Sequence, residues 1–137
     1  MTINIVIHLT VAYRELTNAE EQLMQILWKI RKGFLKDIVE RFPQPRPAYT
    51  TVSTVIRVLV KKKFIGFKTY GKINEYYPLI SKAEHFKGKL KPIVANYFDG
   101  SRRDMASFFA STHLNLSELE QVKQLIEEKI KEFKKKK

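Results

Sequence analysis

Residues 49–63 read YTTVSTVIRVLVKKK and carry the clearest structural signal in the chain. Its apolar residues recur at the spacing of one helical face, which predicts a helix with a single buried stripe. The stripe consists of Val52, Val55, Ile56 and Leu59. Threonine has a low helix propensity and gains nothing from exposure alone, so its abundance on the other side of the helix points to a function.

The polar side of this helix suits a nucleic-acid groove. Short hydroxyl side chains allow a helix to approach closely, and they can bond to phosphates or to base edges. We therefore predict a DNA-reading helix over about residues 50–62. Its candidate DNA-binding residues are Thr50, Thr51, Ser53, Thr54, Arg57 and Lys61. The alternative is an ordinary solvated polar face, on which Arg57 and Lys61 are simply surface charges.

Two further helices are predicted before this one. Residues 17–20 read TNAE, the form of a capping box, and apolar residues follow at helical spacing. A helix is therefore predicted over 17–31, with Gly33 ending it. A second helix is predicted over 35–42, and the proline-rich run after it makes a stiff turn. Trp28 lies at the margin of the first apolar stripe, where we expect it to pack in the core.

A β-hairpin is predicted after the threonine-rich helix. Two short runs rich in aromatic and β-branched residues, 65–70 and 75–79, flank a basic tip that contains Lys72. Three helices followed by such a hairpin form the winged helix-turn-helix arrangement. The predicted fold class is therefore mainly α with a small β-hairpin, and the winged-helix domain is expected to cover residues 15–80.

Residues 81–137 predict a second unit of three helices. The helices are expected to open at Ser81, Ser101 and Ser117, because each serine is followed three residues later by an acidic residue. The lysines that end the chain form a basic tail. Residues 81–137 are expected to be a helical dimerisation domain.

So small a unit cannot bury its apolar surface alone, and pairing with a second copy is the simplest remedy. Gly88 and Pro92 weaken its first helix and predict a kink or a break there. The predicted dimerisation residues are Tyr97, Phe98, Phe108, Phe109, Val122, Ile126 and Ile130.

Composition narrows the class of partner. The chain has 137 residues and a formal net charge of +12, which favours a polyanion. Residues 1–83 carry 14 Lys and Arg against 6 Asp and Glu, a net charge of +8, so the cationic surface belongs mainly to the N-terminal half. The chain has no cysteine, which excludes disulfides, thiolate metal sites and cysteine nucleophiles.

Catalytic and metal-binding patterns are missing from the sequence. His8, His85 and His113 are dispersed and lack the spacing of metal ligands. There is also no glycine-rich phosphate loop, no activated serine motif and no acidic metal cluster. We expect neither an enzyme nor a bound cofactor.

Residues 1–14 form an apolar N-terminal extension of unknown role. The stretch lacks a basic start and a small-residue cleavage site, and it is too short to span a bilayer. We therefore expect no export and no membrane insertion. The expected location is the cytoplasm, in association with the nucleoid.

An ordered set of motifs resembles the penicillinase repressor (BlaI/MecI/CopY) family over roughly residues 15–130. The motifs are LTNAEE at 16–21, ILW at 26–28, TVST at 51–54, KKKFI at 61–65, EYYPL at 75–79, YFDGS at 97–101 and NLS at 115–117. The resemblance implies a homodimeric winged-helix repressor. Its N-terminal half would bind operator DNA, and its C-terminal helices would form the dimer.

The resemblance also implies residue roles for DNA binding. The third helix would lie in the major groove, with Thr51, Thr54 and Arg57 best placed to touch DNA. Lys72, at the tip of the wing formed by residues 65–79, would follow the adjacent backbone. Arg46 and Lys36 are further candidate phosphate contacts near the entrance of the helix-turn-helix.

This chain departs from the family pattern at three places. Members that control β-lactam resistance are cleaved in the dimerisation helices, commonly at an Asn-Phe bond, and a membrane-bound sensor protease is then a candidate partner. The equivalent bond here is Phe108–Phe109, so the asparagine is absent and cleavage does not follow from the resemblance. The cysteine motif of copper-responsive members is also missing. Lys63 replaces a glycine that ends the recognition helix, and a left-handed lysine costs about 1 kcal/mol.

Two other classes of protein stay open. A winged helix can act as a protein–protein adaptor that binds no nucleic acid, although such modules usually lack a basic recognition face. RNA binding is the third possibility, but the aromatic residues that would stack on bases are placed where a core needs them. DNA binding by a two-fold symmetric dimer would instead require a palindromic operator.

Overall fold

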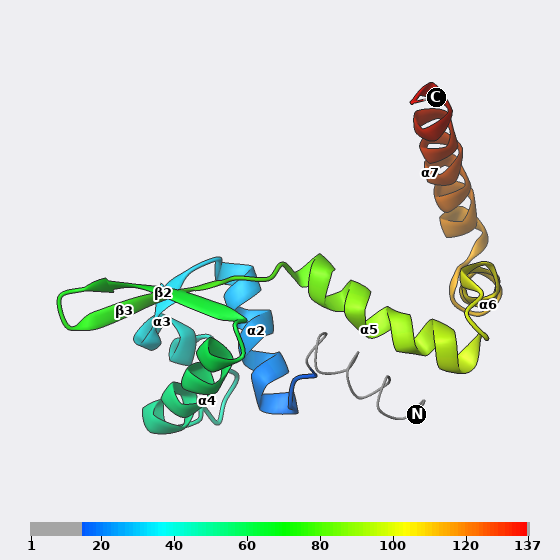
Figure 1. Cartoon of the computed structure of the whole chain (residues 1–137). Coiled ribbons are helices and arrows are strands. Elements are labelled where there is room, and N and C mark those ends of the chain that lie inside the picture. The colour runs from blue at the N-terminus through cyan, green and yellow to red at the C-terminus, as the bar shows by residue number, and fades with distance from the viewer. Residues whose placement is uncertain (1–14, 137) are drawn as a thin grey trace, which may run out of the picture. The chain divides into compact units, whose positions relative to one another are not determined.

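The computed structural model describes residues 15–136, and its elements are shown in Figure 1. The predicted extension over residues 1–14 lies outside the described residues. In chain order the elements are α2 (Asn18–Ile30), β1 (Gly33–Phe34), α3 (Leu35–Glu40), α4 (Tyr49–Lys61), β2 (Ile65–Tyr70), β3 (Ile73–Pro78), α5 (Lys82–Tyr97), α6 (Arg102–His113) and α7 (Leu116–Lys135). The fold is mainly α with one small antiparallel sheet, as the sequence predicts.

The chain divides into two compact units, of which the first ends at Lys89 and the second begins at Leu90. The first unit therefore includes the first two turns of α5 as well as the winged helix. The division by function, into a winged-helix domain at 15–80 and a dimerisation domain at 81–137, stays a prediction.

Helix α2 starts as expected and ends earlier than expected. The Thr17 hydroxyl accepts from the amide of Glu20 at 3.2 Å, and the Glu20 carboxylate accepts from the amide of Thr17 at 3.0 Å, which confirms the capping box. The prediction that Gly33 ends the helix is wrong. Arg31 takes the positive φ of 74° at the helix end, and Gly33 lies in β1. A Cβ at Gly33 would lie 2.9 Å from Ile30 Cδ1, at the flexible end of that side chain, and 3.2 Å from Asp37 Cβ, so a larger residue would have to displace these neighbours.

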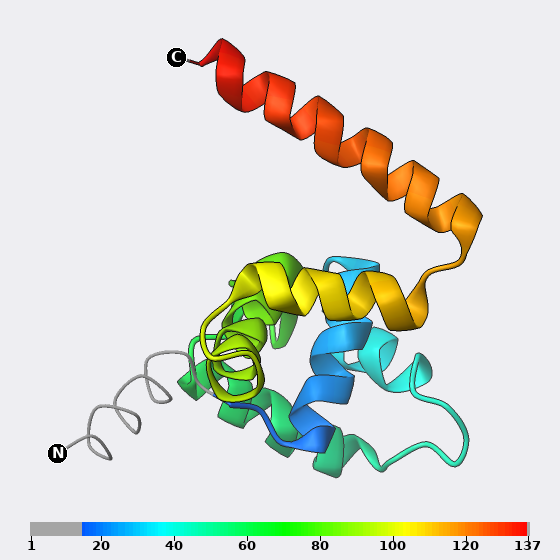
Figure 2. The same ribbon diagram turned by 90° about the vertical axis from the view of Figure 1, so that its right-hand side faces the viewer.

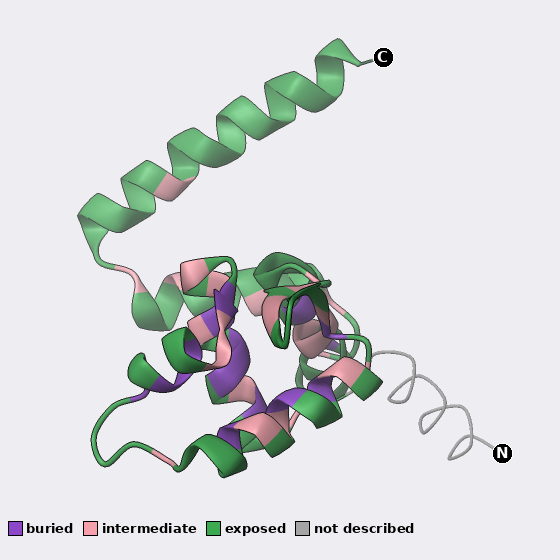
Figure 3. Cartoon of the chain, turned by 90° about the vertical axis from the view of Figure 1, so that its left-hand side faces the viewer, coloured by how far each residue is buried: buried purple, intermediate pink, exposed green. Residues whose placement is uncertain are grey.

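The core of the first unit is built mainly from α2, α3, α4 and the start of β2. The purple segments in Figure 3 mark it. Three of the four residues of the predicted α4 stripe, Val52, Ile56 and Leu59, are buried, and Val55 packs at the edge of the core. The other buried members are Leu23, Met24, Leu27, Ile38, Val39, Phe42, Phe64 and Ile65.

The wing, formed by β2 and β3, belongs to a three-stranded sheet in the order β1-β3-β2. Strand β1 contributes only two residues, with Gly33 opposite Tyr76. The pairing of Tyr70 with Ile73 leaves a two-residue turn, so the predicted four-residue tip was too long. Gly71 takes a φ of 62° in this turn, which a residue without a side chain adopts at little cost.

The second unit has capped helices but almost no core of its own. Ser101 caps α6 as predicted, whereas α7 is capped by Asn115, whose side chain accepts from the Glu118 amide at 2.9 Å. The prediction that Ser117 opens this helix is therefore wrong by two residues. α7 forms one continuous helix (Figure 2). Among the described residues of this unit only Val94 is buried.

The sequence predicts a kink or a break at Gly88 and Pro92. The break is wrong, because α5 continues through both residues from Lys82 to Tyr97. Proline lacks the amide that would bond to the carbonyl four residues earlier, which is the carbonyl of Gly88. The helix thus tolerates a lost hydrogen bond at this point.

Candidate nucleic-acid interface

The polar side of α4 is open to solvent. Five of the six candidate residues that the sequence assigns to this helix are exposed, namely Thr50, Thr51, Thr54, Arg57 and Lys61, and Ser53 is half-buried. The Thr54 hydroxyl donates to the Thr50 carbonyl at 2.9 Å, so its proton is engaged while its oxygen can still accept. The opposite flank of the helix is the core stripe, which holds this face outward. Whether these residues touch DNA stays a prediction.

Two exposed residues of α4 are not among the predicted DNA-binding residues. Tyr49 begins the helix and Val58 lies one residue after Arg57, and both are exposed. Val58 is apolar, and an apolar residue gives no sign in the sequence that it lies on the surface.

The first turn of α4 has no side-chain cap. Its N-cap is Ala48, and no side chain accepts a hydrogen bond from the first turn within the described residues. Helix N-termini carry a partial positive charge and bind phosphate oxygens readily. In the preceding loop, the Arg46 Nε donates to the Phe42 carbonyl at 3.4 Å. This bond holds the exposed guanidinium close to the loop and leaves its terminal nitrogens available.

The three consecutive lysines after α4 have three different environments. Lys61 is exposed, and Lys63 is exposed with a φ of 70°, as the resemblance predicts for the residue in the glycine position. Lys62 instead turns inward, and its Nζ lies 2.7 Å from the Glu20 carboxylate. The sequence does not predict this role, because three identical residues give no sign of which one meets an acidic partner.

The Glu20–Lys62 ion pair connects the end of α4 to the first turn of α2. The side chain of Glu20 is only 8% exposed, against 29% for Lys62. Burial by itself would raise the pKa of Glu20, but hydrogen bonds from Lys62 and from the Thr17 amide outweigh it and hold that pKa below its ordinary value. The carboxylate is therefore charged near neutral pH.

The wing adds exposed cations near its tip. Lys72 lies in the two-residue turn beside Gly71, and Lys68 on β2 has its Nζ 5.3 Å from the centre of the Tyr70 ring. Within residues 15–136, none of Arg57, Lys61 and Lys72 forms an ion pair. Their charges are free to pair with phosphates. Lys36 on α3 is exposed too.

The predicted dimerisation residues are mostly exposed in the single chain. Tyr97 is 79% exposed, and Phe108, Phe109, Ile126 and Ile130 are exposed as well. Phe98 and Val122 are half-buried, and the Phe98 and Phe108 rings lie 5.9 Å apart. Further exposed apolar residues that the dimerisation set omitted are Phe86, Ile93, Leu116, Leu119, Leu125 and Phe133.

The bond between Phe108 and Phe109 lies inside α6. A protease needs an extended substrate, so cutting this bond would require local unwinding of the helix. Phe108–Phe109 stays a candidate cleavage bond only.

No group of three or more His, Cys, Asp or Glu among residues 15–136 could hold a metal ion. No helix in this range is both long enough and apolar enough to cross a membrane.

The chain is similar to known repressor proteins. A family model described as penicillinase repressor matches residues 16–128. The methicillin resistance regulatory protein MecI of Mammaliicoccus sciuri is 27% identical over 117 residues, which cover 84% of this chain and 95% of that protein. MecI of Staphylococcus aureus strain N315 is 26% identical with the same coverage. A solution structure of the DNA-binding domain of the repressor BlaI covers 51% of this chain and 87% of its own, with 20% identity and a TM-score of 0.46. The family match includes residues of both units.

Proposed function

The chain belongs to the penicillinase repressor family, and on that premise we propose that it represses transcription as a homodimer that reads a palindromic operator through α4. It is a DNA-binding transcriptional repressor and not an enzyme. We infer the dimer, the assignment of α4 as the recognition helix, and the residues that contact DNA. A repressor of chromosomal operators works in the cytoplasm, and we assign this protein to the nucleoid there.

The exposed threonine-rich face of α4 is the single observation that carries this proposal. An α-helix fits the major groove of B-DNA, where base edges present distinct patterns of donors and acceptors. Thr51 and Thr54 can approach base edges because their side chains are short. Arg57 has a guanidinium that can pair with two acceptors of one guanine.

Contacts to the phosphate backbone are assigned to cations around α4. Lys61 extends from the last turn, Arg46 precedes the first turn, and Lys72 projects from the wing tip. Each neutralised phosphate adds about 0.9 to the slope of log affinity against log salt for duplex DNA. We therefore expect binding to weaken steeply as salt rises, with Lys36 as a further candidate contact.

A second copy is the proposed cover for the apolar surface of the second unit. Side chains as large as Tyr97 and Phe109 are exposed there, and the unit has almost no interior of its own. Removing such surface from water contributes about 25 cal/mol per Å2, from which the entropic cost of association is subtracted. Two-fold symmetry then requires a palindromic operator with half-sites about one or two DNA turns apart.

A membrane-bound sensor protease is a candidate partner, which would relieve repression by cutting the repressor. The candidate bond is Phe108–Phe109, whose two side chains are exposed on α6. The mass of the intact protein, measured in cells before and after induction, tests it. Fragments that end at Phe108 support the protease, whereas an unchanged mass during full induction contradicts it.

The experiment that tests the proposed function is a binding titration of the full chain on duplex DNA from its own upstream region. A salt series gives the number of phosphates contacted, and an unrelated duplex gives the specificity. We expect the upstream duplex to bind more tightly, with a steep salt slope. A slope near zero would instead favour the protein–protein adaptor.

A further inference from the structure

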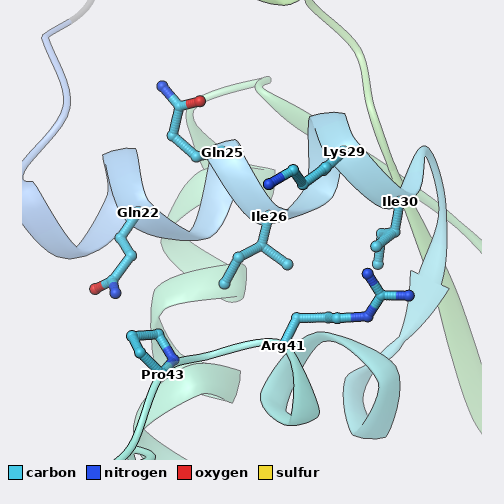
Figure 4. A pocket seen from close by; sticks show the side chains of 7 residues that line it. All are labelled: Gln22, Gln25, Ile26, Lys29, Ile30, Arg41 and Pro43. Carbon is cyan, nitrogen blue, oxygen red and sulfur yellow. The ribbon is translucent and has the colours of Figure 1, made fainter.

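A pocket of about 580 Å3 lies between α2 and the first two turns of α5, inside the first unit. Sites for small organic molecules typically measure about 300–1,000 Å3. A second hollow of about 260 Å3 lies between α2 and α3, where the Arg41 guanidinium reaches toward Ile30 (Figure 4). That hollow is smaller than the range, and all its lining residues are exposed or half-buried. The larger pocket is therefore the stronger candidate for a binding site.

None of the residues that line the larger pocket is among those assigned to DNA contact. His85 is 2% exposed, and its Nε2 lies 3.1 Å from a carboxylate oxygen of Glu21. The His85 ring lies 5.6 Å from the Trp28 ring, centre to centre. Trp28 donates its indole N–H to the Ile80 carbonyl at 2.8 Å. Because that N–H is engaged, Trp28 offers the pocket an apolar ring rather than a donor.

The rim of the pocket carries aromatic and cationic side chains. Phe86 is 57% exposed, which leaves a large apolar surface for a ligand to cover. The Lys89 Nζ lies 3.3 Å from Glu21, so these two charges offset each other. Lys82 has no ion pair within the described residues. The pocket therefore keeps one uncompensated positive charge beside apolar walls.

We propose that this pocket binds a small aromatic monocarboxylate. The aromatic ring would contact Trp28 and Phe86, and the carboxylate would pair with Lys82. A single negative charge matches the single uncompensated cation. The second charge of a dianion would have only Lys89 as a partner, and Lys89 is already paired with Glu21. The proposal goes beyond DNA binding and does not rest on it.

Trp28 allows a direct test, because it is the only tryptophan of the chain. The full-length protein is titrated with phenylacetate while Trp28 emission is followed with excitation at a wavelength that the ligand does not absorb. We expect a saturable change in emission. Phenylacetamide has the same ring without the charge, so we expect it to bind about tenfold more weakly, as for the loss of one charge-assisted hydrogen bond.

Variants then locate the binding site. Lys82→Met should weaken phenylacetate binding about tenfold. Lys29→Met is the matched control, since Lys29 is an exposed lysine on α2 that does not line this pocket, and it should leave binding unchanged. Both lysines are exposed, so both variants should fold, and circular dichroism checks this.

Three results would overturn the proposal. They are the absence of saturation, equal affinity for the acid and the amide, and equal effects of the two lysine variants. Binding seen in a monomeric variant but not in the wild-type protein would also overturn it, because a second copy would then be the occupant of the pocket. Calorimetry of the same titration keeps the test independent of any change in Trp28 emission, and none of these readouts involves DNA.

Discussion

Replacing Lys62 with methionine should lower the stability of the fold without removing a phosphate contact. The change keeps a long apolar side chain but deletes the ammonium group that lies 2.7 Å from the Glu20 carboxylate. Glu20 would retain the hydrogen bond from the Thr17 amide at 3.0 Å. Removing one partner of a fully buried ion pair costs about 3–5 kcal/mol. Since Lys62 is 29% exposed and water can reach the site, we expect a smaller loss of about 1.5–3 kcal/mol.

Lys61→Met is the matched control for this prediction, because the neighbouring lysine is exposed and forms no ion pair within the described residues. Urea unfolding measures the stability of both variants, and a salt series on the upstream duplex measures their phosphate contacts. We expect Lys61→Met to change stability by less than about 0.5 kcal/mol and to lower the salt slope by about 0.9.

The two variants should therefore show opposite patterns. Lys62→Met should unfold at lower urea and keep the wild-type salt slope, although its affinity can fall if the end of α4 shifts. A Lys62 variant with wild-type stability and a reduced salt slope would refute this reasoning. Lys62 would then be a phosphate contact, and its ion pair with Glu20 would contribute nothing.

Three other predictions test separate parts of the protein. Arg57→Ala should weaken operator binding by about 1–3 kcal/mol at fixed salt, and wild-type affinity in a filter or anisotropy assay would remove Arg57 from the interface. Glutamates placed together at Ile126 and Ile130 should give monomers with weak DNA affinity, and sedimentation that still finds a dimer would count against the proposed interface. Because the pKa of Glu20 is lowered, its contribution to stability is present above its ordinary pKa of 4.5 and is lost as pH falls through the folded-state value. Glu20→Gln should flatten this part of the acid-unfolding profile relative to wild type, and an unchanged profile would argue against the pair.

The sequence predicted the elements whose signals are strongly periodic. The α4 stripe could be read from Val52, Ile56 and Leu59 because burial repeats with the helical period. The capping box at Thr17 was equally clear, since two side chains at a fixed spacing satisfy two amides. The exposure of the polar face of α4 follows directly from these signals.

Other features could not be read from a local pattern. Strand β1 has only two residues, too few for any period to appear, and it forms because β3 offers it an open edge. At the start of α7, Asn115-x-x-Glu118 and Ser117-x-x-Glu120 both have the form of a capping box, and the helix uses the first. The role of Lys62 and the pocket beside Trp28 depend on residues that are brought together only by the fold.

The contact between α4 and the bases can be measured most directly by nuclear Overhauser effects in the complex of methyl-labelled protein with the upstream duplex. The methyl groups of Thr51 and Thr54 should show cross-peaks to base protons in the major groove, including thymine methyl groups. A saturated, specific complex in which these threonine methyls show no cross-peak to DNA would contradict the assignment of α4 as the recognition helix.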